Sequence, residues 1–295
     1  MKRLTLLLLG LALAWPAAAN AQLTMQMPGG WAFTFSGNVN AFLVYEKEDD
    51  GGATTTPGGI VGNTDEGTSR IRTGLLPAFA VFDAKGREGK TNLGVHFGFA
   101  PQIQCGGAVH DCFGAQIDMR QVYLTVGGSW GQILAGRELG VFGRQNILTD
   151  QTLYGTGATG GQLGGGTTLG RIGFGYIYPN FVSQITYSSK PDRPLVVTVG
   201  LFDPAVNGPY DQIQLPRLEG EAVYSKAEWK GWVGYALQSN KDPATDEGAT
   251  AVGVSGGVRY TAKSFSVTGS GYYGRGVGTT LLFNEAITSG TVDGT

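Results

Sequence analysis

The sequence has few charged side chains and no apolar run long enough to cross a bilayer as a helix. Charged residues make up 15% of the 295 residues, and the 23 acidic and 21 basic side chains nearly balance. A nucleic-acid-binding protein would carry a basic stripe, so the balance argues against that class. A membrane-spanning helix needs roughly 18–20 consecutive apolar residues. Because the sequence has no run of that length, it is not expected to be a helical membrane protein. The 41% content of hydrophobic residues is too high for a disordered chain.

Cysteine and histidine are also scarce, with two residues of each. Cys105 and Cys112 are separated by six residues, and in an exported protein we expect this pair to form a local disulfide. The chain-entropy model gives about 2.5 kcal/mol for closing so small a loop. His110 and Asp111 lie nearby but are too few for a metal site. We therefore expect neither a metal nor a cofactor.

The first 21 residues have the order of a secretory signal peptide. Lys2 and Arg3 form a basic start, an apolar stretch follows over residues 4–15, and Ala19-Asn20-Ala21 provides a small-residue cleavage site. We expect cleavage after Ala21 and export of residues 22–295 by a bacterium.

From residue 31 onward, apolar and polar residues alternate with a period of two. The first such stretch has Trp31, Phe33, Phe35, Gly37, Val39, Ala41, Leu43 and Tyr45 at odd positions, with Thr34, Ser36, Asn38 and Asn40 between them. The pattern returns over residues 93–99, 252–260 and 264–270. Side chains of a strand point alternately to its two faces. The alternation therefore predicts strands with one apolar and one polar face.

Eleven such strands are predicted, joined by connections that alternate between long and short. The strands cover residues 31–45, 70–82, 91–100, 117–126, 130–137, 178–189, 195–202, 217–228, 232–239, 250–260 and 264–275. Aromatic residues stand at strand ends, among them Trp31, Tyr45, Tyr260 and Tyr273. Outer-membrane barrels have long outer loops, short periplasmic turns and aromatic girdles. The fold class predicted is an all-β, antiparallel transmembrane β-barrel in the outer membrane of a Gram-negative bacterium.

Eleven strands cannot close such a barrel. Bacterial single-chain barrels have even strand numbers. An unpaired edge in lipid would leave backbone groups without hydrogen bonds. We therefore expect either that the barrel domain over residues 22–295 is incomplete at its C-terminus or that the count is wrong by one.

Three segments resemble the Gram-negative general porins. They are MRQVYLTVGGSWGQILAGR at Met119–Arg137, RIGFGYIYPNF from Arg171, and FSGNVNAFLVYE at Phe35–Glu46. The resemblance covers about residues 31–275. It implies a 16-stranded, trimeric, water-filled barrel for passive diffusion of small hydrophilic solutes and ions. It also implies that the third loop, here about residues 138–177, folds inward as a constriction.

The resemblance further implies a cluster of arginines facing an acidic third loop. The candidate pore-lining residues are Arg70, Arg72, Arg120, Arg137 and Arg171, with Glu138 and Asp150 as the acids near or in the loop. Arg70 and Arg72 have the parity opposite to Ile71 and should face water, whereas Arg120 shares its parity with apolar residues such as Val122. So few loop carboxylates predict a weak anion preference. The alternative is that the arginines only satisfy loop contacts or line the rim.

Other functions stay open at this point. A substrate-specific channel for phosphate, organic anions or sugars would use the same arginines or an aromatic track. An outer-membrane enzyme would need a nucleophile with a base, and neither His96 nor His110 has a partner at useful sequence spacing, so we expect no catalytic residues. A soluble secreted β-protein would need a polar outer surface. The expected partners are outer-membrane lipid, diffusing solutes and ions, and, from the resemblance, two further copies of the chain.

Overall fold

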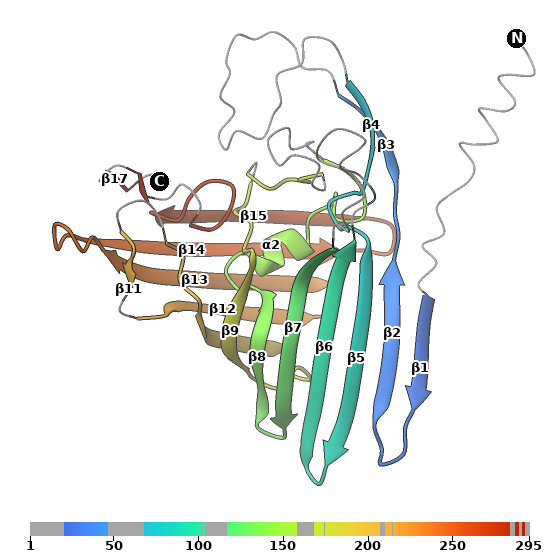
Figure 1. Cartoon of the computed structure of the whole chain (residues 1–295). Coiled ribbons are helices and arrows are strands. Elements are labelled where there is room, and N and C mark those ends of the chain that lie inside the picture. Colours follow the sequence, from blue (N-terminus) through green and yellow to red (C-terminus); the bar gives the residue numbers. More distant parts are fainter. Residues whose placement is uncertain are drawn as a thin grey trace, which may run out of the picture.

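Antiparallel strands make up most of the protein in the computed structural model (Figure 1). The structure describes residues 21–46, 68–101, 103, 117–157, 168–173, 175–206, 210–213, 215–283, 287–288 and 291–292. The only α-helix among them is α2 (Arg144–Leu148). None of the described helical segments is long and apolar enough to cross a membrane.

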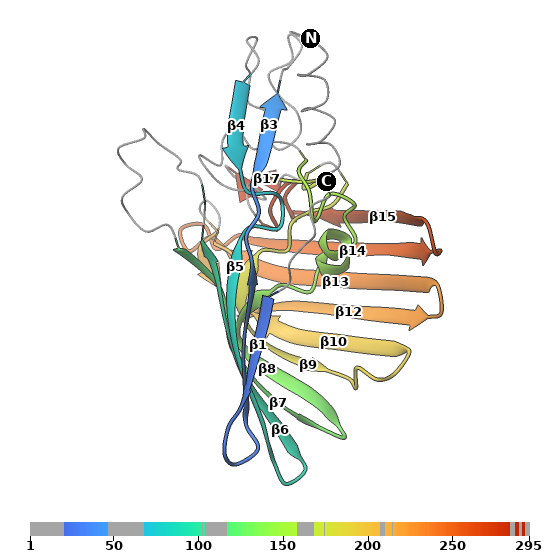
Figure 2. The same cartoon turned by 90° about the vertical axis from the view of Figure 1, so that its right-hand side faces the viewer.

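One 13-stranded sheet forms the body of the molecule. Its spatial order is β1 (Ala21–Gln26), β2 (Ala32–Asn38), β5 (Phe79–Glu88), β6 (Thr91–Pro101), β7 (Ile117–Gly128), β8 (Gly131–Leu139), β9 (Phe181–Ser188), β10 (Leu195–Phe202), β12 (Arg217–Lys226), β13 (Trp229–Lys241), β14 (Gly248–Thr261) and β15 (Ser266–Arg275), with β11 (Gln212–Ile213) paired to β13. Two separate hairpins are β3 (Phe42–Glu46) with β4 (Thr68–Arg72), and β16 (Ile287–Thr288) with β17 (Thr291–Val292). Figures 1 and 2 show the main sheet twisting and curving so that α2 lies on its concave side.

The two faces of this sheet differ as the alternation predicts. Along β13, Val233, Tyr235 and Leu237 are exposed, whereas Gln238 and Asn240 on the other face are buried. The same exposed apolar face continues over the neighbouring strands, with Phe82, Val95, Phe97, Leu124, Ile133, Ile185, Val197, Val199, Leu201, Val252, Val254 and Val258. Apolar residues thus cover the convex face, and polar residues face the concave side. A transmembrane barrel has this arrangement, with its apolar band turned outward.

Aromatic rings gather beside the short hairpin connections. Trp130 and Tyr187 stack with their ring centroids 6.2 Å apart, and the Tyr187 hydroxyl donates to the Trp130 carbonyl at 2.7 Å. Trp229 lies 4.9 Å from Tyr260, which in turn lies 6.2 Å from Phe265. These rings correspond to the aromatic girdle expected at one membrane interface.

Two predicted strands are interrupted. The predicted strand over residues 31–45 divides into β2 and β3, and the one over 70–82 divides into β4 and β5. Asn40 accounts for the break, because its Nδ2 donates to the Leu76 carbonyl at 2.8 Å and its Oδ1 accepts from the Gly74 N–H at 2.9 Å. Pro77 has no N–H to give to a ladder. Residues 73–77 therefore leave the sheet.

Other boundaries also differ from the prediction. β5 runs to Glu88 through residues predicted as a turn, so that residues 89 and 90 alone connect it to β6, with Gly89 at a φ of 56°. β1 was not predicted as a strand. The connection predicted at 229–231 is shifted, because β13 already begins at Trp229 and Ala227 forms the turn with a φ of 50°.

Candidate functional site

The segment between β8 and β9, residues 140–180, returns onto the concave face of the sheet, and we name it the inner loop. Its described parts are residues 140–157, 168–173 and 175–180. On one side it binds residues 73–77 through backbone hydrogen bonds. The Leu75 N–H donates to the Gly155 carbonyl and the Leu76 N–H to the Leu153 carbonyl, both at 3.1 Å. Residues that the sequence pattern assigns to a strand thus support the inner loop instead.

On its other side the inner loop binds Glu219 of β12. This side chain is completely buried, and its Oε2 accepts the N–H groups of Val141 and Phe142 at 2.9 Å each. Arg217, also buried, donates from Nε to Oε1 at 2.7 Å. A buried carboxylate needs such charge-assisted partners to offset its desolvation. Glu219 therefore joins the start of the inner loop to the wall.

Three side chains of the helix α2 bind two further residues of the same wall. Glu221 forms an ion pair with Arg144 and accepts from Gln145 Nε2 at 3.0 Å. Trp232 donates from Nε1 to Asn146 Oδ1 at 3.0 Å. Both glutamates have the parity opposite to Leu218, so their inward direction follows from the alternation, but their burial does not. Glu219 is thus a buried attachment point and not a solvated part of the wall.

Phe142 fits against a glycine of the wall. A Cβ atom at Gly253 would lie 2.9 Å from Phe142 Cζ and 3.0 Å from Val277 Cγ1. Only a residue without a side chain leaves this space, and Phe142 itself is buried. Glycine accounts for 50 of the 295 residues, and Gly253 shows that one use of it is to make room on the concave face for the inner loop.

Asp150 holds the inner loop together internally. Its Oδ1 accepts from the N–H and hydroxyl of Thr152 at 2.8 and 2.7 Å, and its Oδ2 accepts from the Arg171 N–H at 3.0 Å and the Tyr176 hydroxyl at 2.5 Å. Burial, followed by the hydrogen bond and negative charge of Asp150, raises the pKa of Tyr176 well above its ordinary value. Tyr176 stays protonated and donates to Asp150.

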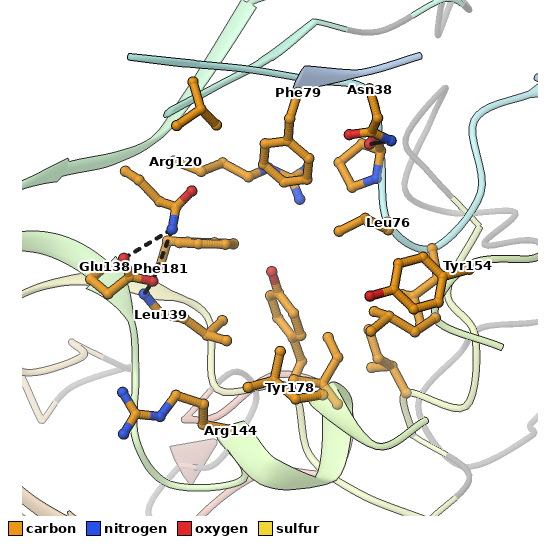
Figure 3. Close-up of a pocket in the computed structure, with 18 of the residues that line it drawn as sticks. Asn38, Leu76, Phe79, Arg120, Glu138, Leu139, Arg144, Tyr154, Tyr178 and Phe181 are labelled. Atoms are coloured by element: carbon orange, nitrogen blue, oxygen red, sulfur yellow. Dashed lines mark hydrogen bonds between the residues drawn. The ribbon is translucent and has the colours of Figure 1, made fainter. Parts of the chain in front are cut away.

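A cavity of about 1190 Å³ lies between the inner loop and the wall. Its lining comes from β1, β2, β5, β7, β8 and β9, from the supporting segment at residues 73–77, from the three described parts of the inner loop, and from Leu281. Figure 3 shows Arg120, Phe79, Phe181, Tyr178 and Tyr154 around it. The inner loop is thus bonded to β12 on one side and leaves open space beside β2, β5 and β7 on the other.

Arg120, whose parity points it to the apolar face, lies on the concave side and lines this cavity. The reason is a bulge between β6 and β7, where Gly98 pairs with Gln121 and Phe99 with Met119, so that Arg120 is the extra residue. A bulge redirects the side chain of the extra residue. The Arg120 Nε donates to Asp118 at 2.7 Å, and its guanidinium lies 5.7 Å from the Phe181 ring centre.

The structure corrects the position of Arg137. Arg137 pairs with Val122 of β7 and Ser183 of β9, residues of the convex face, and it is exposed. The next residue, Glu138, points to the concave side and accepts from Gln121 Nε2 at 2.9 Å. Arg137 therefore does not line the pore.

The other predicted residues are divided between two places. Arg70 and Arg72 lie on β4, which belongs to a separate hairpin and not to the main sheet; Arg72 is buried. Arg171 is exposed on the inner loop, where its backbone binds Asp150. The structure therefore brings Arg120 and Glu138 together at the cavity, and Arg171 and Asp150 together in the loop. Cys105 and Cys112 lie outside the described residues.

His96 has a partner that its sequence spacing does not reveal. Its Nδ1 lies 2.9 Å from Asp83 Oδ1 across the β5–β6 pair, and its ring stacks on Tyr123 at 4.6 Å. His96 Nε2 is buried without a hydrogen-bond partner in the described part of the chain. The pair therefore has no nucleophile to activate there. No group of three or more His, Cys, Asp or Glu side chains within the described ranges is placed to hold a metal ion.

Comparison with known proteins agrees with this geometry. The family model of the Gram-negative porin matches residues 5–292. The solved structure of the outer membrane channel DcaP of Acinetobacter baumannii is similar, with a TM-score of 0.62 and 15% identity over 91% of this chain and 72% of that one. An anion-selective porin from Comamonas acidovorans gives a TM-score of 0.58 and 13% identity, covering 83% of this chain and 68% of that chain. OmpF of Salmonella typhi, in complex with daunomycin, gives a TM-score of 0.55 and 12% identity, covering 86% of this chain and 68% of that chain. At these identities the structures show a shared fold. No curated protein sequence matches the chain.

Proposed function

Since the chain belongs to the Gram-negative porin family and is therefore an outer-membrane channel protein, we propose that its inner loop forms the constriction past which ions and small hydrophilic solutes diffuse. The observation that carries this proposal is the two-sided attachment of the inner loop. Glu219 binds it to β12, and residues 73–77 bind it on the opposite side. A segment fixed at both sides narrows a water-filled lumen to a constant width. Pore width and lumen charge determine what such a channel passes.

The conductance of a Glu219→Ala variant tests the constriction. The substitution removes the acceptor of two backbone N–H groups and leaves Arg217 buried without its ion-pair partner, so we expect the inner loop to detach. Single channels in planar lipid bilayers should then show a higher and noisier conductance than the wild type. Breaking a buried pair costs about 3–5 kcal/mol, so Glu219→Gln, which keeps the shape and one acceptor oxygen, serves as a milder second variant.

Glu228→Ala is the matched control, because Glu228 is exposed in the turn between β12 and β13. We expect its conductance to equal that of the wild type. If Glu219→Ala and Glu219→Gln channels also conducted like the wild type, with the same noise, the inner loop would not be the constriction.

The charges on the concave face support a weak anion preference. Four cationic side chains occupy concave positions near the short turns: Lys85, Arg87, Lys230 and Arg259. The register supports this assignment, since Lys85 pairs with Gly94 and Lys230 pairs with Arg259. None of the four has an ion pair among the described residues. Two concave acids are neutralised by ion pairs, Glu219 with Arg217 and Glu221 with Arg144. Asp83, beside His96, and Glu138, bonded to the neutral Gln121, keep their negative charges, so the four cations outnumber these two acids. Unpaired positive charge along a lumen attracts anions.

Three finer expectations remain predictions for the assembled protein. They are assembly as a homotrimer, cleavage of the signal peptide after Ala21, and a disulfide between Cys105 and Cys112. Ala21 is the first residue of β1, so the proposed cleavage would leave the rest of that strand intact.

A further inference from the structure

The cavity beside the inner loop is more apolar than the passage of small ions requires. Leucine, isoleucine and aromatic side chains line it, from the supporting segment at residues 73–77, from β5, from β9 and from the inner loop. Phe79, Tyr178 and Phe181 present their rings to it (Figure 3). Ligand pockets combine a mostly apolar lining with a few placed polar groups. The lining therefore favours a solute with an apolar body.

The polar groups of the cavity are concentrated near Arg120. Its side chain reaches in beside Phe79 (Figure 3). Its ion pair with Asp118 uses only Nε, and the Asp118 side chain is 48% exposed, so the pair is weak. No hydrogen bond joins the other guanidinium N–H groups to a residue in the described ranges. An arginine fork matches the geometry of a carboxylate.

The hydroxyl of Tyr178 is a second donor in the same space. It points into the cavity in Figure 3, and no described residue hydrogen-bonds to it. Burial raises the pKa of Tyr178 to about 12, so the phenol is neutral and can donate at physiological pH. Arg120 and Tyr178 together can bind one carboxylate.

Two further charges limit the ligand to a single negative charge. Glu138 lines the cavity near Arg120, bonded to Gln121 and to its own neighbour Leu139, and would repel a second carboxylate. Arg144 also lines the cavity, but its guanidinium turns away to Glu221 (Figure 3). The positive charge of Arg144 is therefore already neutralised.

We propose that this cavity is a binding site for organic monocarboxylates that carry an apolar ring. The carboxylate is held by Arg120 and Tyr178, and the ring packs among Phe79, Phe181 and Leu76. This inference rests on the proposed channel function and assigns it a solute class. The volume of the cavity, about 1190 Å³, exceeds that of one ring, so we expect occupancy to reduce the ion current without abolishing it.

Competition between solutes and the ion current tests the site. Full-length protein in planar bilayers is titrated with benzoate, acetate, benzyl alcohol and benzylammonium at constant ionic strength. Benzoate should reduce the current at concentrations about tenfold below those needed for acetate, which lacks the ring, or for benzyl alcohol, which lacks the charge. A tenfold ratio corresponds to a difference in binding free energy of about 1.4 kcal/mol. Benzylammonium should have no effect in the same range, and phthalate, with two carboxylates, should act more weakly than benzoate.

Substitutions assign the effect to these residues. Arg120→Gln should weaken the action of benzoate about tenfold, and Phe181→Ala should weaken it while leaving the response to acetate unchanged. Arg137→Gln is the matched control, an arginine near the same end of the neighbouring strand but on the convex face, and should behave like the wild type.

The outcomes separate this inference from the channel function. Normal channels on which benzoate and acetate act alike would overturn the ring-carboxylate site and leave the channel intact. Equal sensitivity of the wild type and Arg120→Gln would place any benzoate site elsewhere and also overturn the assignment. If the purified protein formed no channels, the proposed function would fail, and this inference with it.

Discussion

At the scale of single residues, Gly253 shows how an absent side chain positions a functional segment. Phe142 of the inner loop occupies the space that a Cβ at Gly253 would enter. We expect Gly253→Val to displace Phe142 and to lower stability by about 1–3 kcal/mol, the usual cost of overpacking. The temperature at which the folded, fast-migrating band disappears in detergent electrophoresis measures this loss.

Gly269→Val provides the control for that experiment. Gly269 lies on β15 and a Cβ there would meet no atom within 4 Å. The two substitutions add the same atoms to neighbouring strands of one sheet. An equal drop in unfolding temperature for both would show that strand propensity, and not the contact with Phe142, determines the effect.

The arginines show what residue-level reasoning from sequence can and cannot predict. Alternation correctly assigns Glu219 and Glu221 to the concave face because their strand is regular. It gives the wrong direction for Arg120, because a bulge adds one residue and the bulge is not visible in the pattern. Arg137 was assigned to the lumen from its place beside the third loop, although its register with Val122 fixes it on the convex face.

At the scale of elements, the internal hydrogen bonds of the inner loop predict a dependence on pH. The pKa of Tyr176 is raised in the folded protein, so its contribution to stability is fully present below the ordinary tyrosine pKa of about 10 and declines as the pH rises above it. We expect the open-channel current noise of the wild type to increase above about pH 10, because a displaced loop in which water reaches Tyr176 can then ionise this side chain, which favours the displaced state. Recordings between neutral and alkaline pH check this.

Variants of two tyrosines distinguish this bond from general alkaline damage. Tyr176→Phe channels lack the hydroxyl, and their open-channel current should be noisier already at neutral pH. The reason is the loss of a hydrogen bond to a charged group, which contributes about 1.5–3 kcal/mol. Tyr154→Phe, at a loop position that is 82% exposed, should behave like the wild type. Quiet Tyr176→Phe channels at neutral pH would contradict a stabilising role for this hydrogen bond.

Most elements could be predicted because their signal is local. Period-two alternation and turn residues place β6, β7, β8, β10 and β15 within a few residues of their observed ends. Residues 73–77 could not be assigned in this way. Leu75, Leu76 and Ala78 continue an apolar strand pattern, and their backbone partners, Leu153 and Gly155, lie far along the chain in the inner loop.

At the scale of the whole molecule, the unpaired cations of the concave face predict ion selectivity. In a salt gradient we expect a reversal potential of the sign that favours chloride over potassium. The double variant Lys85→Gln/Arg87→Gln should shift this potential toward zero, since it removes two of the four unpaired positive charges. Arg137→Gln, which removes a charge from the convex face, should leave it unchanged. Clear preference for potassium in the wild type would contradict the anion preference.

The membrane-facing character of the molecule was predictable, while the interior was only partly so. One apolar face over many strands is a property of the sequence alone, and it identifies the side that contacts lipid. The cavity cannot be read from the sequence in this way, because its lining combines β1, β2, β5, β7, β8, β9 and the inner loop. Which of these side chains meet depends on strand register and on the path of the inner loop.

The contacts of Glu219 also constrain the order of biogenesis. Val141 and Phe142 precede their shared acceptor by 78 and 77 residues, so the connection after β8 cannot take its final position until β12 has been added to the sheet. Contacts between residues so distant in sequence form late, because closing a long chain segment costs entropy before any bond is gained. During insertion the protein therefore passes through a stage in which the inner loop is not yet bound to the wall, and the lumen narrows only after β12 has joined the sheet.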